Sequence, residues 1–363
     1  MRAAIRRAGR LVCDEVADPV PEAGQVLVKT LCCGICGSDL HALHHFEHLM
    51  GLSRRADGER VEIGRPEDSP DIIFGHEFCV EVLDYGPGMT ARLKPGTRAV
   101  SVPVTFDSQG PHTLGYSPIH PGGFAERMVL TDFMLLEVPN GLSAEHAATT
   151  EPFSVGAHAV VKAQMEKDSV ALVIGCGPVG LAVIASLKAR GHGPVVAADY
   201  SPRRRKAAEA MGADVVIDPA TESPNARWAD FGVPATSTAV RLARMSGKAW
   251  ARPVVFECVG APGVLESVVE GCPPGAKVVV AGVCMETDRI EPSLAVTKEL
   301  SLEFVLGYTP EEFAATLGDL AEGRIDPSPI LTGKVGLSGV AGAFEALASP
   351  EDHVKILVEP GQD

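Results

Sequence analysis

Long apolar runs are missing from this chain of 363 residues. No segment approaches the ~18 consecutive apolar residues that a membrane-spanning helix requires, so we expect no membrane partner. The charged residues at 1–7 are not followed by the apolar segment of a secretory signal peptide. These absences predict a cytoplasmic protein.

Positive charge is also scarce. The chain has 32 Lys and Arg against 47 Asp and Glu, a formal net charge of −15. Binding to nucleic acid regardless of its sequence requires cationic side chains that neutralise phosphates, so we expect no nucleic-acid partner. With 45% hydrophobic and 22% charged residues, the composition is that of a globular protein. The length predicts two domains.

Cysteines follow no regular spacing, and their number, nine, is odd. A secreted disulfide framework is therefore not expected. No cysteine lies between Cys79 and Cys176, so a structural zinc site of four cysteines cannot form there. We expect the loop at 105–123, which is rich in Gly, Pro, Ser and His, to be a surface excursion held by ordinary packing.

Three polar clusters stand in the first half of the chain. The stretch 34–41, GICGSDLH, carries a thiol, a hydroxyl, a carboxylate and an imidazole, and it is followed by His76-Glu77 and by Glu151-Pro152. Cys, His and Glu are ligands of catalytic zinc, where three protein groups leave one tetrahedral position open. A buried structural cysteine is the alternative for a single Cys. The recurrence of all three ligand types predicts one catalytic zinc, with the metal ligands and nearby polar groups drawn from Cys36, Ser38, Asp39, His41, His76, Glu77 and Glu151.

Segment 44–74 is polar and irregular, and His44, His45, Glu47 and His48 lie near its beginning. We expect a solvated helix there. A second metal site at these residues is the alternative.

The pattern of short strands and turns changes at about residue 153 to alternating strands and helices, which predicts an α/β protein with a parallel sheet in its second part. We place the boundary beside Glu151-Pro152. Residues 1–152 and 307–363 are expected to form a mainly antiparallel β domain that binds zinc, because the last segment, with a helix at 311–323 and a strand at 354–358, should return to it. Residues 153–306 are expected to form a doubly wound Rossmann domain.

A dinucleotide fingerprint begins the second domain. The apolar run 170–174 leads into GCGPVG at 175–180 and then into an apolar helix at 181–190. Gly175 permits the tight turn, Gly177 lets the pyrophosphate approach the backbone, and Gly180 lets the helix pack closely on the strand. The predicted contacts in this loop are Gly175, Gly177, Pro178, Val179 and Gly180.

The next apolar run ends at Asp199, 19 residues after Gly180. A carboxylate there accepts hydrogen bonds from the adenine ribose and repels a 2′-phosphate, which favours NAD. Arg203, Arg204 and Arg205 follow closely. They form either a solvated helix face or a 2′-phosphate site for NADP, and we include Arg204 among the candidate cofactor contacts.

The ordered set of motifs resembles the zinc-dependent medium-chain dehydrogenase/reductase family of alcohol, polyol and threonine dehydrogenases. The set consists of 34–41, Gly75-His76-Glu77, GGFAE at 122–126, EPFSVG at 151–156, and the fingerprint with Asp199. It spans nearly the whole chain. The resemblance implies a GroES-like catalytic domain, a homodimer or homotetramer, and a small-molecule alcohol as substrate.

The resemblance also implies roles for individual residues. Cys36 and His76 bind zinc together with Glu77 or Glu151, where many alcohol dehydrogenases have a Cys in place of that Glu. Ser38 bonds the substrate oxygen and His41 passes its proton onward. The alternatives are that Ser38 only caps a helix that begins near Asp39, and that His41 is a solvated residue of that helix. Asp39 supports the metal ligands.

Two departures from the family pattern matter. The structural zinc is expected to be absent, and the 40 residues from Cys36 to His76 include an insertion at 44–74 beside the metal. We expect NAD-linked oxidation of a secondary alcohol or polyol to the ketone. The alternatives are a threonine-type, aldehyde or primary-alcohol dehydrogenase, a zinc-free quinone or enone reductase, and an NAD-sensing protein without activity.

Overall fold

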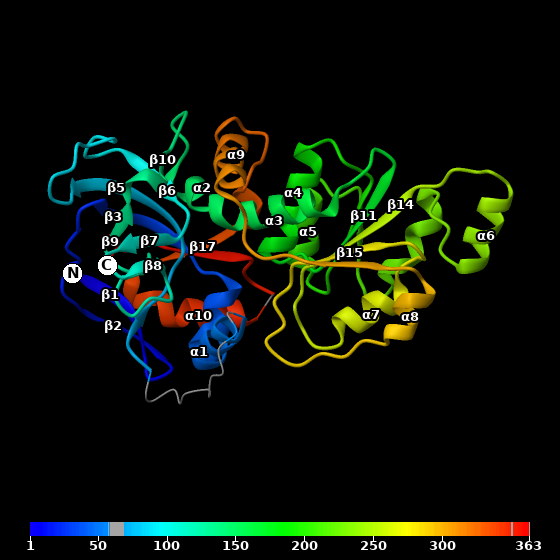
Figure 1. Ribbon diagram of the computed structural model, residues 1–363, viewed down its shortest axis with the longest axis horizontal. Helices are drawn as coiled ribbons and strands as arrows, with labels where there is room; N and C mark the ends of the chain where they lie inside the picture. The colour runs from blue at the N-terminus through cyan, green and yellow to red at the C-terminus, as the bar shows by residue number, and fades with distance from the viewer. Residues whose placement is uncertain (57, 59–68, 350, 363) are drawn as a thin grey trace. The chain divides into compact units, whose positions relative to one another are not determined.

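The computed structural model describes residues 1–56, 58, 69–349 and 351–362, drawn in colour in Figure 1. Residues 57 and 59–68, which belong to the insertion expected at 44–74, lie outside the part of the chain that the structure describes. The chain divides into two compact units. The first contains Met1–Glu151, Phe313–Gly323 and Leu331–Asp363, and the second contains Pro152–Glu312 and Arg324–Ile330. Residues 307–312 and Arg324–Ile330 thus join the second unit, although the sequence assigned 307–363 whole to the first.

Strands dominate the first unit. They are β1 (Arg2–Arg7), β2 (Arg10–Glu15), β3 (Gln25–Gly34), β4 (Ile72–Ile73), β5 (Glu77–Tyr85), β6 (Arg98–Ser101), β7 (Val104–Asp107), β8 (Gly110–Thr113), β9 (Arg127–Thr131), β10 (Leu135–Glu137), β17 (Leu331–Val335) and β18 (Lys355–Val358). The main sheet has the order β10-β6-β5-β3-β18-β17, with β9 also paired to β3. Within it, β17 and β18 run parallel and the other pairs are antiparallel. Strands β1, β2 and β4 form a second sheet.

The main sheet buries alternate residues. Val26 and Val28 of β3 and Val80 and Val82 of β5 are fully buried, as the two-residue period of a strand requires when one face meets the core. Each such side chain contributes about 1.5–3 kcal/mol when it leaves water. Helix α1 (Gly37–Ala56) and helix α10 (Val340–Ala348) supply further residues to this core. Helix α2 (Ala144–Ala148) and most of α9 (Pro310–Ala321) complete the unit, with short 3₁₀ turns at Asp132–Met134 and Leu337–Gly339.

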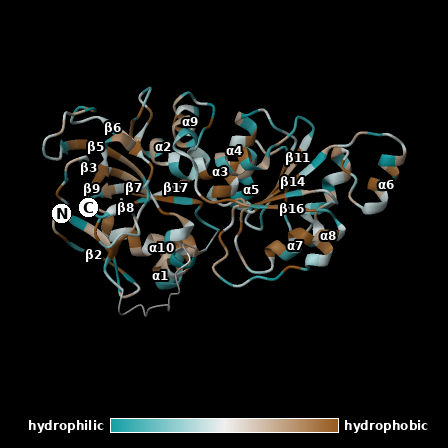
Figure 2. Ribbon diagram, viewed as in Figure 1, coloured by the Kyte–Doolittle hydropathy of each residue, from teal (hydrophilic) through white to brown (hydrophobic). Residues whose placement is uncertain are grey.

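The second unit is a parallel sheet with helices. Its strands are β11 (Ser169–Ile174), β12 (Val195–Ala198), β13 (Val215–Ile217), β14 (Arg252–Glu257), β15 (Lys277–Val280) and β16 (Ser301–Phe304). Its helices are α3 (Thr150–Ala163), α4 (Pro178–Ala189), α5 (Pro202–Ala210), α6 (Ser237–Met245), α7 (Val264–Gly271) and α8 (Pro292–Thr297). Two 3₁₀ turns lie at Pro224–Phe231 and Ser328–Ile330. The order β13-β12-β11-β14-β15-β16 is the dinucleotide-binding order, with every pair parallel. The predicted fold class is therefore confirmed. Figure 2 shows brown, hydrophobic segments along these strands, as expected for a sheet covered on both faces.

One expectation about a loop needs correction. The segment at 105–123 is not a plain surface loop, because β7 and β8 pair there as an antiparallel hairpin. The helix expected near Asp39 begins at Gly37 and extends to Ala56, with a kink at His45 (φ −126°, ψ 27°). Among the described residues, no helix is long and apolar enough to span a membrane.

Candidate zinc and dinucleotide sites

Three of the predicted metal ligands converge in the first unit. The thiol of Cys36, the imidazole of His76 and the carboxylate of Glu77 each offer a ligand atom, and these atoms all lie within 4.8 Å of one another. His76 and Glu77 are buried and Cys36 is partly exposed. A soft thiolate, an imidazole and a carboxylate are donors that fit zinc, with one side of the site accessible.

The local fold brings these residues together from two strands. Cys36 lies between β3 and α1, and its carbonyl accepts hydrogen bonds from the N–H groups of Asp39 and Leu40 in the first turn of α1. His76 directly precedes β5 and Glu77 is its first residue. Strand β5 pairs with β3 so that Gly34 lies opposite Glu77. Antiparallel pairing therefore places two residues 40 positions apart beside each other.

Asp39 supports this arrangement from inside. Its Oδ2 accepts a hydrogen bond from the Cys36 N–H at 3.0 Å, and its Oδ1 lies 3.4 Å from Nδ1 of His76. Oδ1 of Asp39 and Nδ1 of His76 are both buried, and neither has a hydrogen-bond partner among the described residues. A small movement of the imidazole would close this contact. A carboxylate at the far nitrogen of a histidine ligand orients the ring and leaves Nε2 for the metal.

Glu77 has a partner that the sequence did not reveal. The ammonium of Lys355 lies 2.6 Å from Oε1 and 2.5 Å from Oε2 of Glu77, and it also donates to the carbonyl of Ile35 at 3.1 Å. Burial lowers the pKa of Lys355, but the charges of Glu77 and Cys36 outweigh that effect and the pKa is raised. Gly34 makes room for this pair, because a Cβ there would lie 2.0 Å from Oε2 of Glu77.

Ser38 faces the same cluster. Tyr116 donates its hydroxyl hydrogen bond to Oγ of Ser38 at 2.8 Å, and the same Oγ lies 3.5 Å from Nε2 of His76. Burial raises the pKa of Tyr116, so the phenol keeps its proton. Tyr116 was missed because nothing in the sequence links the loop after β8 to the start of α1. Since α1 begins at Gly37, Ser38 lies inside its first turn and not at its cap.

Other predicted residues lie apart from the three ligands. His41 is exposed on α1, and no hydrogen bond joins it to Ser38 among the described residues. Glu151 is partly buried in the first turn of α3, near enough for its charge to raise the pKa of Lys355, but outside the ligand cluster. The alternative metal site near the start of 44–74 is not formed by the described residues, since Glu47 instead pairs with Arg6 at 2.9 Å.

In the second unit, the fingerprint loop joins β11 to α4. Gly175 has φ 89° and a Cβ at Gly180 would lie 1.8 Å from the carbonyl oxygen of Gly175, so both positions require glycine. A Cβ at Gly177 would meet only Arg204, at 3.9 Å. The backbone at Gly177 is therefore open for a phosphate at the start of α4.

Asp199 lies beside this loop at the end of β12. Its Oδ2 accepts a hydrogen bond from the Cys176 N–H at 2.7 Å, and its Oδ1 accepts one from the Ser201 N–H at 2.8 Å. Arg204 approaches Oδ2 at 4.0 Å, whereas Arg205 pairs with Asp218 at 3.0 Å. Asp199 thus holds the fingerprint loop as well as offering a negative charge to a ribose.

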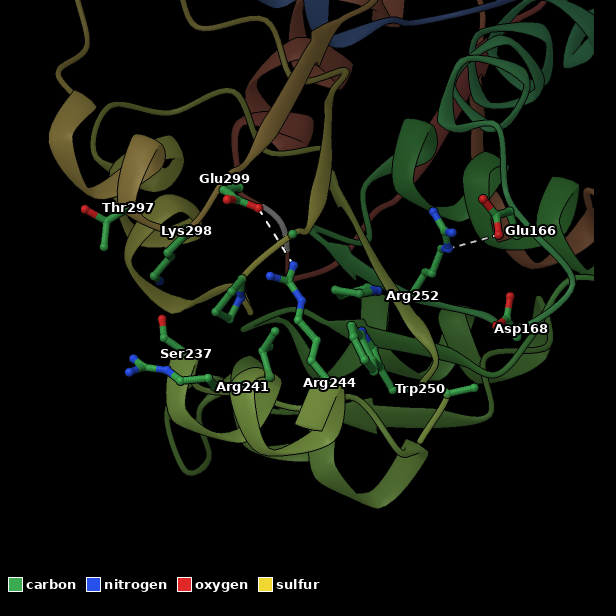
Figure 3. Close-up of a pocket in the computed structure, with 15 residues that line it drawn as sticks. Glu166, Asp168, Ser237, Arg241, Arg244, Trp250, Arg252, Thr297, Lys298 and Glu299 are labelled. Atoms are coloured by element: carbon green, nitrogen blue, oxygen red, sulfur yellow. Dashed lines mark ion pairs between the residues drawn. The ribbon is translucent and has the colours of Figure 1, made fainter. Parts of the chain in front are cut away.

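A cavity of about 600 Å³ occupies the opposite edge of this sheet. Figure 3 shows Arg241, Arg244 and Arg252 around it with Glu166 and Glu299. It lies where β11, β14 and β15 begin, whereas cofactors bind at the carboxyl ends of parallel strands. This cavity is therefore separate from the dinucleotide site.

Comparison with known proteins decides the family. A model described as an alcohol dehydrogenase GroES-like domain matches residues 22–140, and one described as a zinc-binding dehydrogenase matches residues 178–322. The (R,R)-butanediol dehydrogenase of Bacillus subtilis is 31% identical over 360 residues, which cover 96% of each chain. The chain belongs to the zinc-dependent medium-chain dehydrogenase/reductase family. It is a member of a family of oxidoreductases, as the motifs predicted.

Further relatives agree. The sorbitol dehydrogenase of Bacillus subtilis is 27% identical over 382 residues, covering 100% of this chain and 98% of its own. The crystal structure of 2R,3R-butanediol dehydrogenase from Bacillus subtilis superposes with a TM-score of 0.77 at 28% identity, covering 99% of each chain. The resemblance extends over the full length of both units.

Proposed function

We propose that this medium-chain dehydrogenase uses zinc and NAD to oxidise a secondary alcohol or polyol to the ketone. The observation that carries the proposal is the convergence of Cys36, His76 and Glu77 within 4.8 Å, with Ser38 beside them. The named relatives act on butanediol and sorbitol, which supports a secondary hydroxyl as the substrate group. We assign catalysis to the first unit and nucleotide binding to the second.

The chain's own residues have distinct tasks in this proposal. Cys36, His76 and a glutamate would hold the zinc ion, which would supply Lewis-acid polarisation of the substrate hydroxyl and so lower the pKa of that hydroxyl. Asp39 keeps the His76 ring oriented. Lys355 neutralises the buried charge of Glu77 and limits its freedom to act as the third ligand. Glu151 is the second candidate for that position.

Ser38 is suited to receive the substrate proton. Tyr116 already donates to its oxygen, so the hydrogen of Ser38 itself is available to be passed on as the substrate proton arrives. His41 lies three residues further on the same helix, where i and i+3 side chains are neighbours. Partial burial of the otherwise exposed imidazole, with a smaller effect of His45, lowers the pKa of His41, which favours a neutral imidazole that can accept a proton at neutral pH.

We propose NAD as the cofactor because Asp199 places a carboxylate next to the fingerprint and would repel a 2′-phosphate. Arg203 to Arg205 would favour NADP, but Arg205 is already paired with Asp218. We also propose a cytoplasmic homodimer or homotetramer. Phe304, the last residue of the edge strand β16, is 68% exposed, and Leu306 just after the strand is 87% exposed, which supports an assembly that covers them.

The test is turnover with a panel of secondary alcohols, vicinal diols, sugar alcohols, threonine and primary alcohols, followed by the absorbance of the reduced cofactor. We expect activity with secondary hydroxyls and NAD, its loss after chelation, and its return with zinc. Cys36→Ser should remove activity, whereas Cys13→Ser, at an exposed cysteine, should not. Activity that survives chelation would favour the zinc-free reductase, and NAD binding without any turnover would favour the sensing protein.

A further inference from the structure

A second group of metal-binding side chains lies in the first unit, away from Cys36. Asp107, His112 and His120 each offer a ligand atom, and these atoms all lie within 4.8 Å of one another. Oδ1 of Asp107 is 2.9 Å from Nε2 of His112, and Oδ2 is 2.8 Å from Nε2 of His120. The three side chains are 4%, 16% and 10% exposed.

The β7–β8 hairpin, labelled in Figure 1, carries two of these three residues, Asp107 and His112. In its register Thr105 pairs with His112 and Asp107 pairs with Gly110. Side chains two residues apart share a face of a strand, as do cross-strand partners, so Asp107 and His112 lie on the face that holds Thr105. Gly110 has no side chain to crowd Asp107.

The hairpin and the third ligand are held in place separately. Thr105 is fully buried and its hydroxyl lies 3.3 Å from that of Thr131 on β9. His120 lies in a turn that is held by Ser117. The Oγ of Ser117 accepts hydrogen bonds from the N–H groups of Ile119 and His120, both at 3.1 Å. The three side chains are therefore positioned before any ion binds.

Asp107 brings a negative charge to this group. Asp107 also accepts a hydrogen bond from the Gln109 N–H at 2.7 Å. Among described residues, the ion-pair partners of this buried carboxylate are the two imidazoles, with no Lys or Arg. A buried anion of this kind is stabilised by a cation.

We propose that Asp107, His112 and His120 bind a divalent transition-metal ion, with zinc as the best match, at a site independent of Cys36. Two imidazole nitrogens and one carboxylate oxygen are borderline ligands that suit zinc, with the remaining tetrahedral position available to water. Ligand atoms ~2.1 Å from zinc lie ~3.4 Å apart at a tetrahedral angle. The observed contacts of 2.9 Å and 2.8 Å need to open by ~0.5 Å to admit the ion.

The ion has a structural consequence at the first site. Tyr116, which donates to Ser38, lies between His112 and His120 in the chain. A metal bound to both histidines fastens the loop that carries Tyr116. It also raises the expected number of bound ions from one per chain to two. Because Nε2 of each imidazole binds the ion, the single ring proton of each neutral imidazole must lie on Nδ1 in the bound state.

Metal content of the full chain, purified without chelator and dialysed against metal-free buffer, tests the proposal. We expect two zinc ions per chain in the unmodified protein, and one in His120→Gln or Asp107→Asn. The matched control is His158→Gln, because His158 makes a single imidazole–carboxylate contact of 2.8 Å with Glu312 in the second unit. It should retain both ions.

Cobalt titration separates the two sites and does not depend on the loop variants folding. In the double variant Cys36→Ser, His76→Gln, one cobalt ion should still bind and give ligand-field bands without a thiolate charge-transfer band. If this variant binds no cobalt, or if His120→Gln retains the zinc content of the unmodified chain, the proposal is overturned. The group is then a hydrogen-bonded network that holds the loop.

Discussion

Ser38 has two polar neighbours that belong to different parts of the first unit. Its hydroxyl meets Tyr116 from the loop after β8 and His76 from the start of β5. A residue that only capped α1 would instead bond a backbone N–H in the first turn. The observed contacts point the hydroxyl at the ligand cluster.

For the proton relay, we predict that Ser38→Ala lowers turnover by about a hundredfold, the usual scale for a proton-transfer group, while Ser38→Thr keeps most activity. His41→Gln should slow alcohol oxidation chiefly at pH about 6–7 and less at higher pH, where hydroxide can take the proton. Because the pKa of His41 is lowered by its partial burial, its imidazole is neutral, and able to accept a proton, in a larger fraction of molecules than a free histidine over this range. Profiles of kcat against pH measure both effects. An equal loss at every pH in His41→Gln would leave zinc binding intact and remove His41 from the relay.

Lys355 is the other residue whose place depends on distant chain segments. It is 1% exposed, as is its partner Glu77. Removing one member of a buried ion pair leaves the other charge without compensation, which is more costly than replacing both. This pair therefore ties the C-terminal strand β18 to the metal ligands.

At the scale of secondary-structure elements, Lys334 connects three segments of the first unit: β17, α2 and the residue that follows β18. Lys334 on β17 lies 2.6 Å from Glu145 on α2 and 2.8 Å from Glu359 after β18. The hydrogen bond from Lys334 lowers the pKa of Glu145 from 4.5 to about 2. Both side chains are partly exposed, so solvent screens the pair.

We predict that Lys334→Met lowers the free energy of unfolding by about 1 kcal/mol or less at pH 7. Since the folded-state pKa of Glu145 is depressed, its contribution is complete above pH 4.5 and is lost as the pH falls towards about 2. The difference in the free energy of unfolding between the Lys334→Met variant and the unmodified chain should therefore become smaller below pH 4.5. Urea unfolding at several pH values measures it. Lys162→Met is the control, because Lys162 and Glu303 are 3.9 Å apart and exposed. A difference that grows with acidification would contradict the assignment.

At the scale of the whole molecule, the two units have separate hydrophobic cores. The ligand cluster rests on strands β3 and β5 of the first unit, whereas Asp199 ends β12 of the second. Cofactor preference and zinc content should therefore respond independently to substitution.

We predict that Asp199→Ala lowers kcat/KM with NAD by about 10-fold to 100-fold, the equivalent of about 1.5–3 kcal/mol for a hydrogen bond to a charged group, and raises the relative use of NADP. Zinc content should not change. Asp199→Asn separates two causes, because it removes the charge but keeps one acceptor for the Cys176 or Ser201 N–H. An increase in the relative use of NADP in both variants supports repulsion between the Asp199 carboxylate and the 2′-phosphate as the cause. If the unmodified enzyme already prefers NADP, the arginines at 203–205 decide the cofactor.

Local patterns in the sequence predicted much of this protein. A run such as 170–174 followed by GCGPVG predicts strand, phosphate loop and helix, because each depends on neighbouring residues alone, and β11 and α4 confirm it. The ligand types Cys36, His76 and Glu77 were also named from residue chemistry. Hairpin β7–β8 was missed because its strands are short and its Gly and Pro residues are typical of loops.

The sequence by itself determined the family and the parallel sheet of the second unit, and it named Cys36, His76 and Glu77 as candidate zinc ligands, since these follow from side-chain chemistry and short-range periodicity. Only the tertiary structure decided which groups meet. Lys355 reaches Glu77 across 278 residues, and Tyr116 reaches Ser38 across 78. Such contacts depend on the register of paired strands and the path of loops between them, which no local pattern specifies.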